Sequence, residues 1–198
     1  MSQRRVIGLT GGIATGKTTV ANFLVQTYGF AIFDADVFAR EAVAPGSPVL
    51  QQIVDRYGRE ILLLDGQLDR SRLGQIVFKD PSERRWLEAQ IHPDVRRRFV
   101  EGIQQANSTV VLVVPLLFEA EMTDLVSEIW VVFCPLDRQL ERLQQRNGYR
   151  EADARSRIEA QMPLEQKCQR ANLILDNSGD RTVWQHQIRS WLEEPING

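Results

Sequence analysis

The residues best suited to chemistry form a glycine-rich stretch near the N-terminus, Gly11-Gly12-Ile13-Ala14-Thr15-Gly16-Lys17-Thr18. Their spacing fits the pattern G-x-x-x-x-G-K-[ST], in which backbone N–H groups cradle phosphates, the lysine reaches the β and γ phosphates, and the hydroxyl meets Mg²⁺. An apolar run (6–9) precedes the stretch and a helical pattern (19–28) follows it, so the loop should end at a helix N-terminus. A glycine turn between an unrelated strand and helix is the alternative interpretation. The pattern predicts a site for a nucleoside triphosphate.

Two carboxylates, Asp34 and Asp36, follow the second apolar run of the chain. In extended chain they point to the same side, and the topology of a parallel sheet would bring them to the edge that carries the phosphate loop. One carboxylate can orient an acceptor hydroxyl and take its proton, while the other can hold hydrated Mg²⁺. Either residue is also suited to cap a helix beginning near Val37. The spacing leaves both roles open.

Four arginines, Arg138, Arg142, Arg146 and Arg150, recur every four residues after Pro135. On a helix this spacing forms a basic stripe beside an apolar side. A helical hairpin that carries arginines can cover a bound nucleotide, exclude water and stabilise charge on a transferring phosphoryl group. The alternative is a solvated helix face with local ion pairs.

The elements that must position these residues are short apolar runs with helical segments between them. The runs cover 6–9, 30–33, 109–114, 129–133 and 173–175. They lack clean alternation, which is typical of parallel strands buried on both faces, so an α/β fold is expected. About 75 residues separate the second run from the third, far more than a minimal crossover needs. This stretch predicts a helical insertion, with a helix over 82–107 that is interrupted near Pro93.

Composition narrows the function classes. The chain has 198 residues, a formal net charge of −2 and two cysteines, Cys134 and Cys168. This balance does not favour binding to nucleic acid, and two cysteines make neither a disulfide framework nor a metal site, so Cys134 is interpreted as a small core residue. No run approaches the eighteen apolar residues of a membrane span. We expect a cytoplasmic protein, a monomer or weak homo-oligomer, without nucleic-acid or membrane partners.

With these residues in place, the chain resembles the dephospho-coenzyme A kinase family over nearly its full length. The glycine motif defines only a superfamily, whereas the later motifs are more specific in this order. The resemblance rests on Gly8 to Thr18, Asp34-Ala35-Asp36, Ala39-Arg40, Leu68-Asp69-Arg70, Ile76-Val77-Phe78, Ile91-His92-Pro93, Pro115-Leu116-Leu117-Phe118-Glu119, Gln145-Arg146, Gln161-Met162 and Asp176-Asn177-Ser178-Gly179.

The resemblance implies a P-loop kinase fold, with a central parallel five-stranded sheet flanked by helices. It implies a single unit over 1–198, whose core covers about 1–36, 108–134 and 171–198. A coenzyme-binding helical insertion would cover about 37–107, and an arginine-bearing lid about 135–163. The implied activity is ATP-dependent phosphorylation of the ribose 3′-hydroxyl of dephospho-coenzyme A, the last step of coenzyme A biosynthesis, with Mg²⁺ as cofactor.

The resemblance also implies roles for individual residues. Asp36 matches the catalytic base, Lys17 and Arg142 are the other implied catalytic residues, and Thr18 is the implied metal ligand. The implied nucleotide-binding residues are Gly12, Ile13, Ala14, Thr15, Gly16, Lys17, Thr18, Thr19, Arg146, Asn177 and Gly179. The implied acceptor-site residues are Asp36, Arg72, His92, Leu116 and Glu119.

Two positions depart from the family pattern. Ala14-Thr15 stand where the loop often has Gly-Ser, and alanine lacks the freedom of glycine at positive φ. Val113 stands where many relatives carry an aspartate, so Asp34 or Asp36 would have to hold the water ligands of Mg²⁺. Two other functions fit the phosphate loop: another small-molecule P-loop kinase, such as a nucleoside monophosphate kinase, and a non-enzymatic nucleotide sensor.

Overall fold

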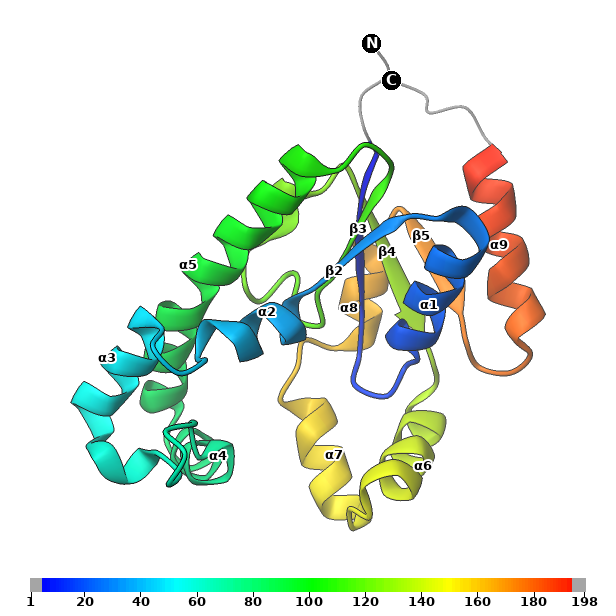
Figure 1. The fold of residues 1–198 in the computed structure, drawn as a ribbon. Helices are drawn as coiled ribbons and strands as arrows, with labels where there is room; N and C mark the ends of the chain where they lie inside the picture. The colour runs from blue at the N-terminus through cyan, green and yellow to red at the C-terminus, as the bar shows by residue number, and fades with distance from the viewer. Residues whose placement is uncertain (1–4, 194–198) are drawn as a thin grey trace. The chain divides into compact units, whose positions relative to one another are not determined.

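The computed structural model describes residues 5–193, which fold into two compact units (Figure 1). The first unit holds residues 5–33 and 106–193, and the second holds 34–105. The terminal parts of the expected core, 1–4 and 194–198, lie outside the described residues. The second unit coincides closely with the expected insertion, 37–107. The finer division into core, insertion and lid stays a prediction.

The first unit is built on a five-stranded sheet with the order β2-β3-β1-β4-β5. Its strands are β1 (Val6–Gly11), β2 (Ala31–Asp34), β3 (Val110–Val113), β4 (Glu128–Phe133) and β5 (Leu173–Asp176). β1 pairs in parallel with both β3 and β4, and β4 pairs in parallel with β5. β1 and β3 are buried throughout, as their continuous apolar runs predict. All five expected strands are confirmed.

Helices of the first unit cover the sheet and follow its strands. They are α1 (Lys17–Tyr28), α6 (Leu136–Asn147), α7 (Glu151–Glu159), α8 (Leu164–Gln169) and α9 (Arg181–Glu193), with a 3₁₀ turn at Thr123–Leu125. Leu24 of α1 and Ile188 of α9 share one buried cluster with Leu9 of β1. Cys134 is fully buried after β4, and burial raises the pKa of its thiol, which confirms it as a core residue.

The second unit is helical and has an apolar cluster of its own. Its elements are α2 (Ala35–Ala42), α3 (Pro48–Tyr57), a 3₁₀ turn at Arg59–Ile61, α4 (Arg70–Lys79) and α5 (Pro81–Gln105). Ile53 of α3, Ile61 of the 3₁₀ turn and Leu73 of α4 meet in the cluster, and Trp86, Leu87 and Ile91 of α5 pack against it. The buried cluster thus joins α3, the 3₁₀ turn, α4 and α5, and the expected insertion is helical.

The expected interruption of the long helix at Pro93 is wrong. α5 runs for 25 residues through Pro93. Proline removes one helical hydrogen bond, which leaves the carbonyl of Ala89 without its N–H donor. Both Pro93 and Ala89 lie on the exposed side of α5, where water can take the place of that donor.

Across residues 5–193, even this longest helix is too charged for a bilayer, and none of the others combines the length and apolarity that crossing one requires.

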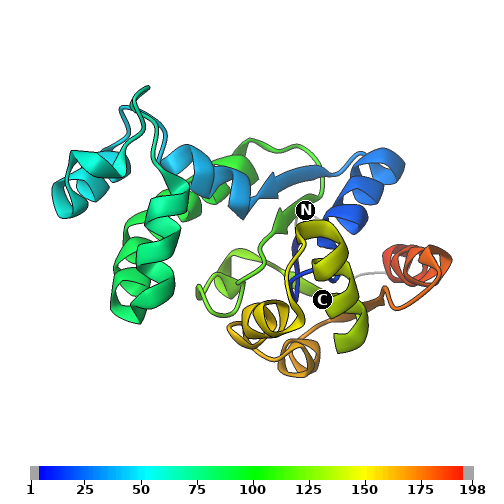
Figure 2. The ribbon, with the colours of Figure 1, turned by 90° about the horizontal axis from the view of Figure 1, so that it is seen from below.

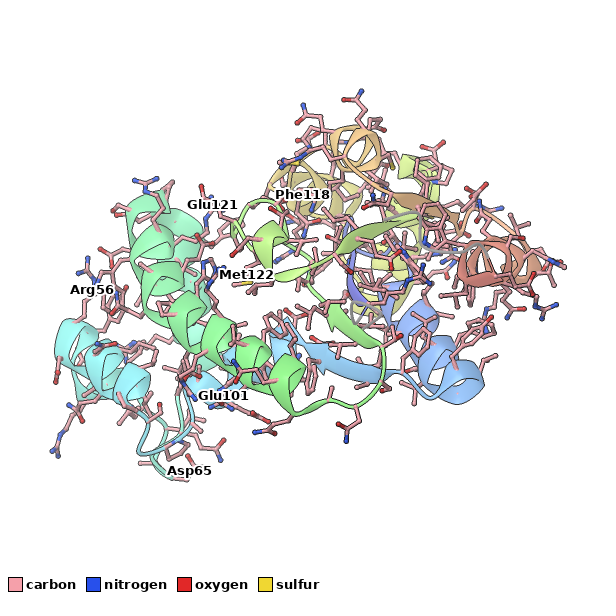
Figure 3. All side chains as sticks on the ribbon, turned by 90° about the horizontal axis from the view of Figure 1, so that it is seen from above. Arg56, Asp65, Glu101, Phe118, Glu121 and Met122 are labelled. Atoms are coloured by element: carbon pink, nitrogen blue, oxygen red, sulfur yellow. The ribbon has the colours of Figure 1, made fainter. Side chains whose placement is uncertain are left out.

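One carboxylate of the second unit predicts a pH-dependent stability. Glu83 on α5 accepts two hydrogen bonds of 2.7 Å from Arg56 on α3 and one from the hydroxyl of Tyr57 (Figure 3 labels Arg56). These bonds, Arg56 first, lower the pKa of Glu83 from 4.5 to about 2. A lowered pKa stabilises the fold above the unfolded value, and that contribution is lost as pH falls from about 4.5 towards 2.

We therefore expect the difference in unfolding free energy between wild type and Glu83→Gln to stay constant above pH 5 and to shrink below it. Urea unfolding at a series of pH values measures this difference. Arg56→Met removes the partner that lowers the pKa most, so adding Glu83→Gln to it should produce only the smaller pH dependence that the hydrogen bond from Tyr57 leaves. A difference that stays constant down to pH 2.5 would contradict the assignment.

Candidate functional site

The phosphate loop connects β1 to α1, and its backbone favours glycine at Gly11, with φ +147°, and at Gly16. Gly16 precedes the first turn of α1 with φ +104°. A Cβ there would overlap the side-chain amide of Asn177. That amide donates a hydrogen bond of 2.7 Å to the carbonyl of Thr15, so Asn177, which follows β5, holds the loop from a distant part of the chain. The glycine is therefore required both by its φ and by the close approach of Asn177.

Ala14 stands where the family often has glycine, and it adopts a positive φ although it carries a Cβ. Its φ is +60°, which costs a residue with a Cβ about 1–2 kcal/mol. The methyl group packs in a cluster with Leu140 and Leu143 of α6 and Ala154 of α7. Apolar contact with these two helices offsets part of the backbone strain.

A cavity of about 590 Å³ opens beside the loop, a size suited to a small ligand. Its lining combines residues of the loop and α1 with residues of α6, of the segment after β5 and of α9. They are Ala14, Gly16, Lys17, Thr18, Thr19, Arg142, Gln145, Arg146, Asn177, Gly179 and Arg181. All but Gln145 and Arg181 are predicted site residues, whereas Gly12, Ile13 and Thr15 of the predicted set do not line it.

Lys17 lies folded over the loop. Its ammonium donates to the carbonyls of Gly11 at 3.0 Å and Gly12 at 2.8 Å. Because four positive side chains line the cavity and no acidic one does, the cavity suits an anion. The start of α1 adds its own positive end to this field.

Arg142 is the arginine of the predicted stripe that ties α6 to the loop. Its guanidinium donates to the carbonyls of Ala14 and Thr15, both at 3.3 Å, and to that of Asn177 at 3.0 Å. Figure 2 shows α6 and α7 side by side in yellow, and α6 ends at Asn147, where Gly148 caps it in a left-handed conformation. Arg150 therefore lies beyond α6, so three of the four arginines of the stripe, Arg138, Arg142 and Arg146, lie on this helix.

Two other arginines of the stripe have local partners. Arg138 pairs with Glu141 at 3.0 Å on the exposed side of α6. Arg150 is 91% exposed and pairs with Asp153 at 3.4 Å. The solvated-face interpretation thus holds for these two, while Arg142 and Arg146 line the cavity.

The two carboxylates after β2 take different positions. The side chain of Asp34 accepts a hydrogen bond of 2.8 Å from the N–H of Asp36 and caps α2. Asp36 lines a second cavity, of about 430 Å³, within the second unit. Apolar side chains dominate the rest of its lining, with Arg40 and Arg70 as its positive groups: Ala39, Arg40, Val43, Leu68, Arg70, Leu73, Gly74, Val77, Leu87 and Ile91. The helix-cap interpretation is confirmed for Asp34, and a further role of its carboxylate stays a prediction.

The remaining predicted acceptor residues are placed elsewhere. Arg72 donates to the carbonyl of Glu60 at 2.6 Å, and neither Arg72 nor His92 lines the second cavity. Leu116 and Glu119 lie in the segment after β3, where the carboxylate of Glu119 accepts a hydrogen bond from the N–H of Met162. Contact of these four residues with an acceptor stays a prediction.

The comparisons decide the family. A family model described as dephospho-CoA kinase matches residues 5–182. The chain belongs to the dephospho-CoA kinase family. It is 54% identical over 195 residues to the dephospho-CoA kinase of Synechococcus elongatus, covering 98% of this chain and 93% of that protein. The match confirms the resemblance seen in the motifs.

Solved structures agree with the fold of this dephospho-CoA kinase family member. The structure of TT1252 from Thermus thermophilus is 33% identical, with a TM-score of 0.82 over 98% of this chain and 99% of that one. Dephospho-CoA kinase from Campylobacter jejuni has a TM-score of 0.71 at 24% identity, covering 97% of both chains, and shows the likeness of fold. The expected P-loop kinase fold is confirmed.

The donor set at the loop fits magnesium in the manner usual for kinases. Among residues 5–193, no three His, Cys, Asp or Glu side chains converge on a metal site. Val113 is buried in β3 and offers no ligand. Thr18 brings one hydroxyl to the cavity beside the loop. Mg²⁺ binds through few protein oxygens, keeps several waters and takes phosphate oxygens from the substrate, so a hydroxyl beside bound phosphates fits its chemistry.

Three residues of the site were missed from the sequence. Gln145 and Arg181 line the cavity, and Gln161 accepts a hydrogen bond of 2.9 Å from the N–H of Ile13 in the loop. Arg181 follows the carboxyl end of β5 by a few residues, the position at which α/β sheets bind ligands, so that signal was present. For Gln161 only its place in a family motif pointed to a role.

Proposed function

We propose that this protein transfers the γ-phosphoryl group of ATP to the ribose 3′-hydroxyl of dephospho-CoA, giving CoA and ADP in the last step of CoA biosynthesis. The observation that carries the proposal is the cationic cavity at the phosphate loop, in a chain that belongs to this family from residue 5 to 182. The family makes the reaction a kinase reaction, and the cavity supplies the groups that such a reaction needs.

The first unit would hold the donor. Lys17 and Arg142 stabilise negative charge on the phosphoryl group as it leaves ADP, and Asn177 and Gly179 line the same cavity for the adenosine end. Thr18 would hold Mg²⁺, which neutralises charge on the β and γ phosphates when bound. Because phosphoryl transfer requires little covalent work from the protein, positioning and electrostatics supply most of the acceleration.

The second unit would hold the acceptor. Most of its lining is apolar, which suits the hydrocarbon parts of the pantetheine arm of dephospho-CoA, and Arg40 and Arg70 suit the diphosphate. Asp36 in the same lining accepts the proton of the 3′-hydroxyl as that oxygen attacks phosphorus.

We further propose that the protein acts in the cytoplasm and that it is a monomer or a weak homo-oligomer.

Release of ADP measured with dephospho-CoA, with adenylate and without an acceptor tests the proposal against both other functions. We expect turnover to depend on dephospho-CoA, with kcat/KM at least about 10³-fold higher than with adenylate, because a site built to hold a polar group rejects analogues lacking it. Preference for adenylate would indicate a nucleoside monophosphate kinase. ATP hydrolysis that no acceptor stimulates would favour a nucleotide sensor.

A further inference from the structure

We propose that Glu119 and Lys167 are positioning residues for nucleotide binding, which act through Gln161 on the phosphate loop. The three residues together are termed the lid-exit clamp, since Gln161 lies where the chain leaves α7 and enters α8. The inference rests on the proposed function only for the nucleotide and does not depend on the identity of the acceptor. It gives Glu119 a role different from contact with the acceptor.

Gln161 holds the loop from outside the cavity. Its side-chain oxygen accepts the N–H of Ile13 at 2.9 Å. Ile13 is not part of the cavity lining, which begins at Ala14, so this bond fixes the loop without occupying the phosphate site. The side chain of Ile13 packs with Leu140 and Leu143 of α6. The loop is thus anchored by both its backbone and its side chain.

Glu119 holds the residue next to Gln161. Its Oε1 accepts the N–H of Met162 at 2.9 Å and lies 2.9 Å from Nζ of Lys167, while Oε2 lies 3.3 Å from the same nitrogen. The side chain is 24% exposed, so much of its carboxylate surface is taken up by these partners. Phe118, labelled in Figure 3, also lies under Arg170, which follows α8. The segment after β3 and the segment after α7 are therefore joined at one carboxylate.

Lys167 closes the connection back to the loop. Its side chain is fully buried, and besides Glu119 it donates to the carbonyl of Pro115 at 2.9 Å. The same carbonyl accepts the hydroxyl of Thr10 at 3.2 Å, and Thr10 precedes Gly11 at the end of β1. A buried ammonium needs such partners, because leaving water is costly for a charge. The contacts thus begin at Thr10, before the loop, and return to it at Ile13.

The consequence is preorganisation of the phosphate loop. A loop held in its binding conformation loses less conformational freedom when the nucleotide arrives, so its affinity is higher. If Glu119 acts by fixing Met162, and so Gln161, then removing either Glu119 or Gln161 removes the same restraint. The two losses should then not add, which is the behaviour of residues that share one network.

The test is the affinity for Mg·ADP, measured by titration calorimetry without an acceptor. We expect Glu119→Ala and Gln161→Ala each to weaken binding about 5–20-fold, the effect of one lost hydrogen bond. The double variant should lie within about twofold of the weaker single variant. Glu119→Gln keeps an acceptor for Met162 and should stay within about threefold of wild type. Glu121→Ala, on an exposed carboxylate of the same segment, is the matched control and should bind as wild type does.

An unchanged affinity of Glu119→Ala for Mg·ADP would overturn the inference. So would losses of affinity that multiply in the double variant. A raised KM of Glu119→Ala for the acceptor, with normal affinity for Mg·ADP, would overturn it as well. If the wild-type protein itself does not bind Mg·ADP, that result would contradict the proposed function instead. Where Glu119→Ala melts below the assay temperature, Lys167→Met and Gln161→Ala test the same clamp. Normal ADP affinity in both would again overturn it.

Discussion

Replacing Asp36 by asparagine is expected to lower kcat about 10²–10⁴-fold while leaving the affinity for ATP unchanged, because the change removes a general base and little volume. Asp36 lines the cavity of the second unit and follows the helix cap, so the amide fits without repacking a core. Steady-state kinetics with both substrates saturating measures the loss. Turnover within a few-fold of wild type would mean that Asp36 is not the base.

Asp34→Asn is the matched control for this variant. It makes the same chemical change two residues earlier, and asparagine caps helices as well as aspartate does. We expect kcat within about threefold of wild type and an unchanged melting temperature, since the hydrogen bond to the N–H of Asp36 survives. Equal losses in both variants would indicate a shared electrostatic or metal-holding role rather than a base at Asp36.

Replacing Arg142 by methionine is expected to lower kcat about 10²–10³-fold, the usual cost of removing a preorganised donor from a charged transition state. Arg142 reaches the carbonyls of Ala14, Thr15 and Asn177, so its guanidinium is fixed at the mouth of the loop. Arg142→Lys should recover little of the activity, because an ammonium lacks the planar fork of donors.

The control for Arg142 lies one turn earlier on α6. Arg138→Met removes an equal charge, which pairs with Glu141 on an exposed surface. We expect kcat and the KM for ATP within about twofold of wild type, as surface pairs contribute little. A loss in Arg138→Met comparable to that in Arg142→Met would assign the effect to the net charge of α6 instead of to the contacts of Arg142.

Much of this fold could be predicted from local patterns. β1 and β3 are short apolar runs that are buried throughout, so the composition of each run predicts a strand. The glycine spacing of the loop is likewise a local pattern. The place of Arg142 and Arg146 at the cavity could be predicted from their spacing of four residues, which is helical. The end of that helix could be predicted from Asn147-Gly148, which follows Arg146 directly. The positive φ of Ala14 agrees with the family pattern, in which glycine often stands at this position.

The rest depends on contacts between residues far apart in the chain. Gly16 and Asn177 meet across 161 positions, and Gln161 reaches Ile13 across 148, so no local pattern announces either contact. Pro93 misled because proline usually breaks a helix, whereas exposure of Ala89 and Pro93 makes the lost hydrogen bond tolerable here. Glu119 likewise pairs with buried Lys167 across 48 positions, and no local pattern predicts that contact.

Phosphorus NMR of the product made from ATP and dephospho-CoA tests the central claim most directly, because it identifies the atom that receives the phosphoryl group. The proposed function predicts stoichiometric ADP and a new phosphomonoester coupled to the ribose 3′ proton, with the diphosphate signals retained. A phosphomonoester at any other oxygen, or inorganic phosphate without a phosphorylated acceptor, would contradict it.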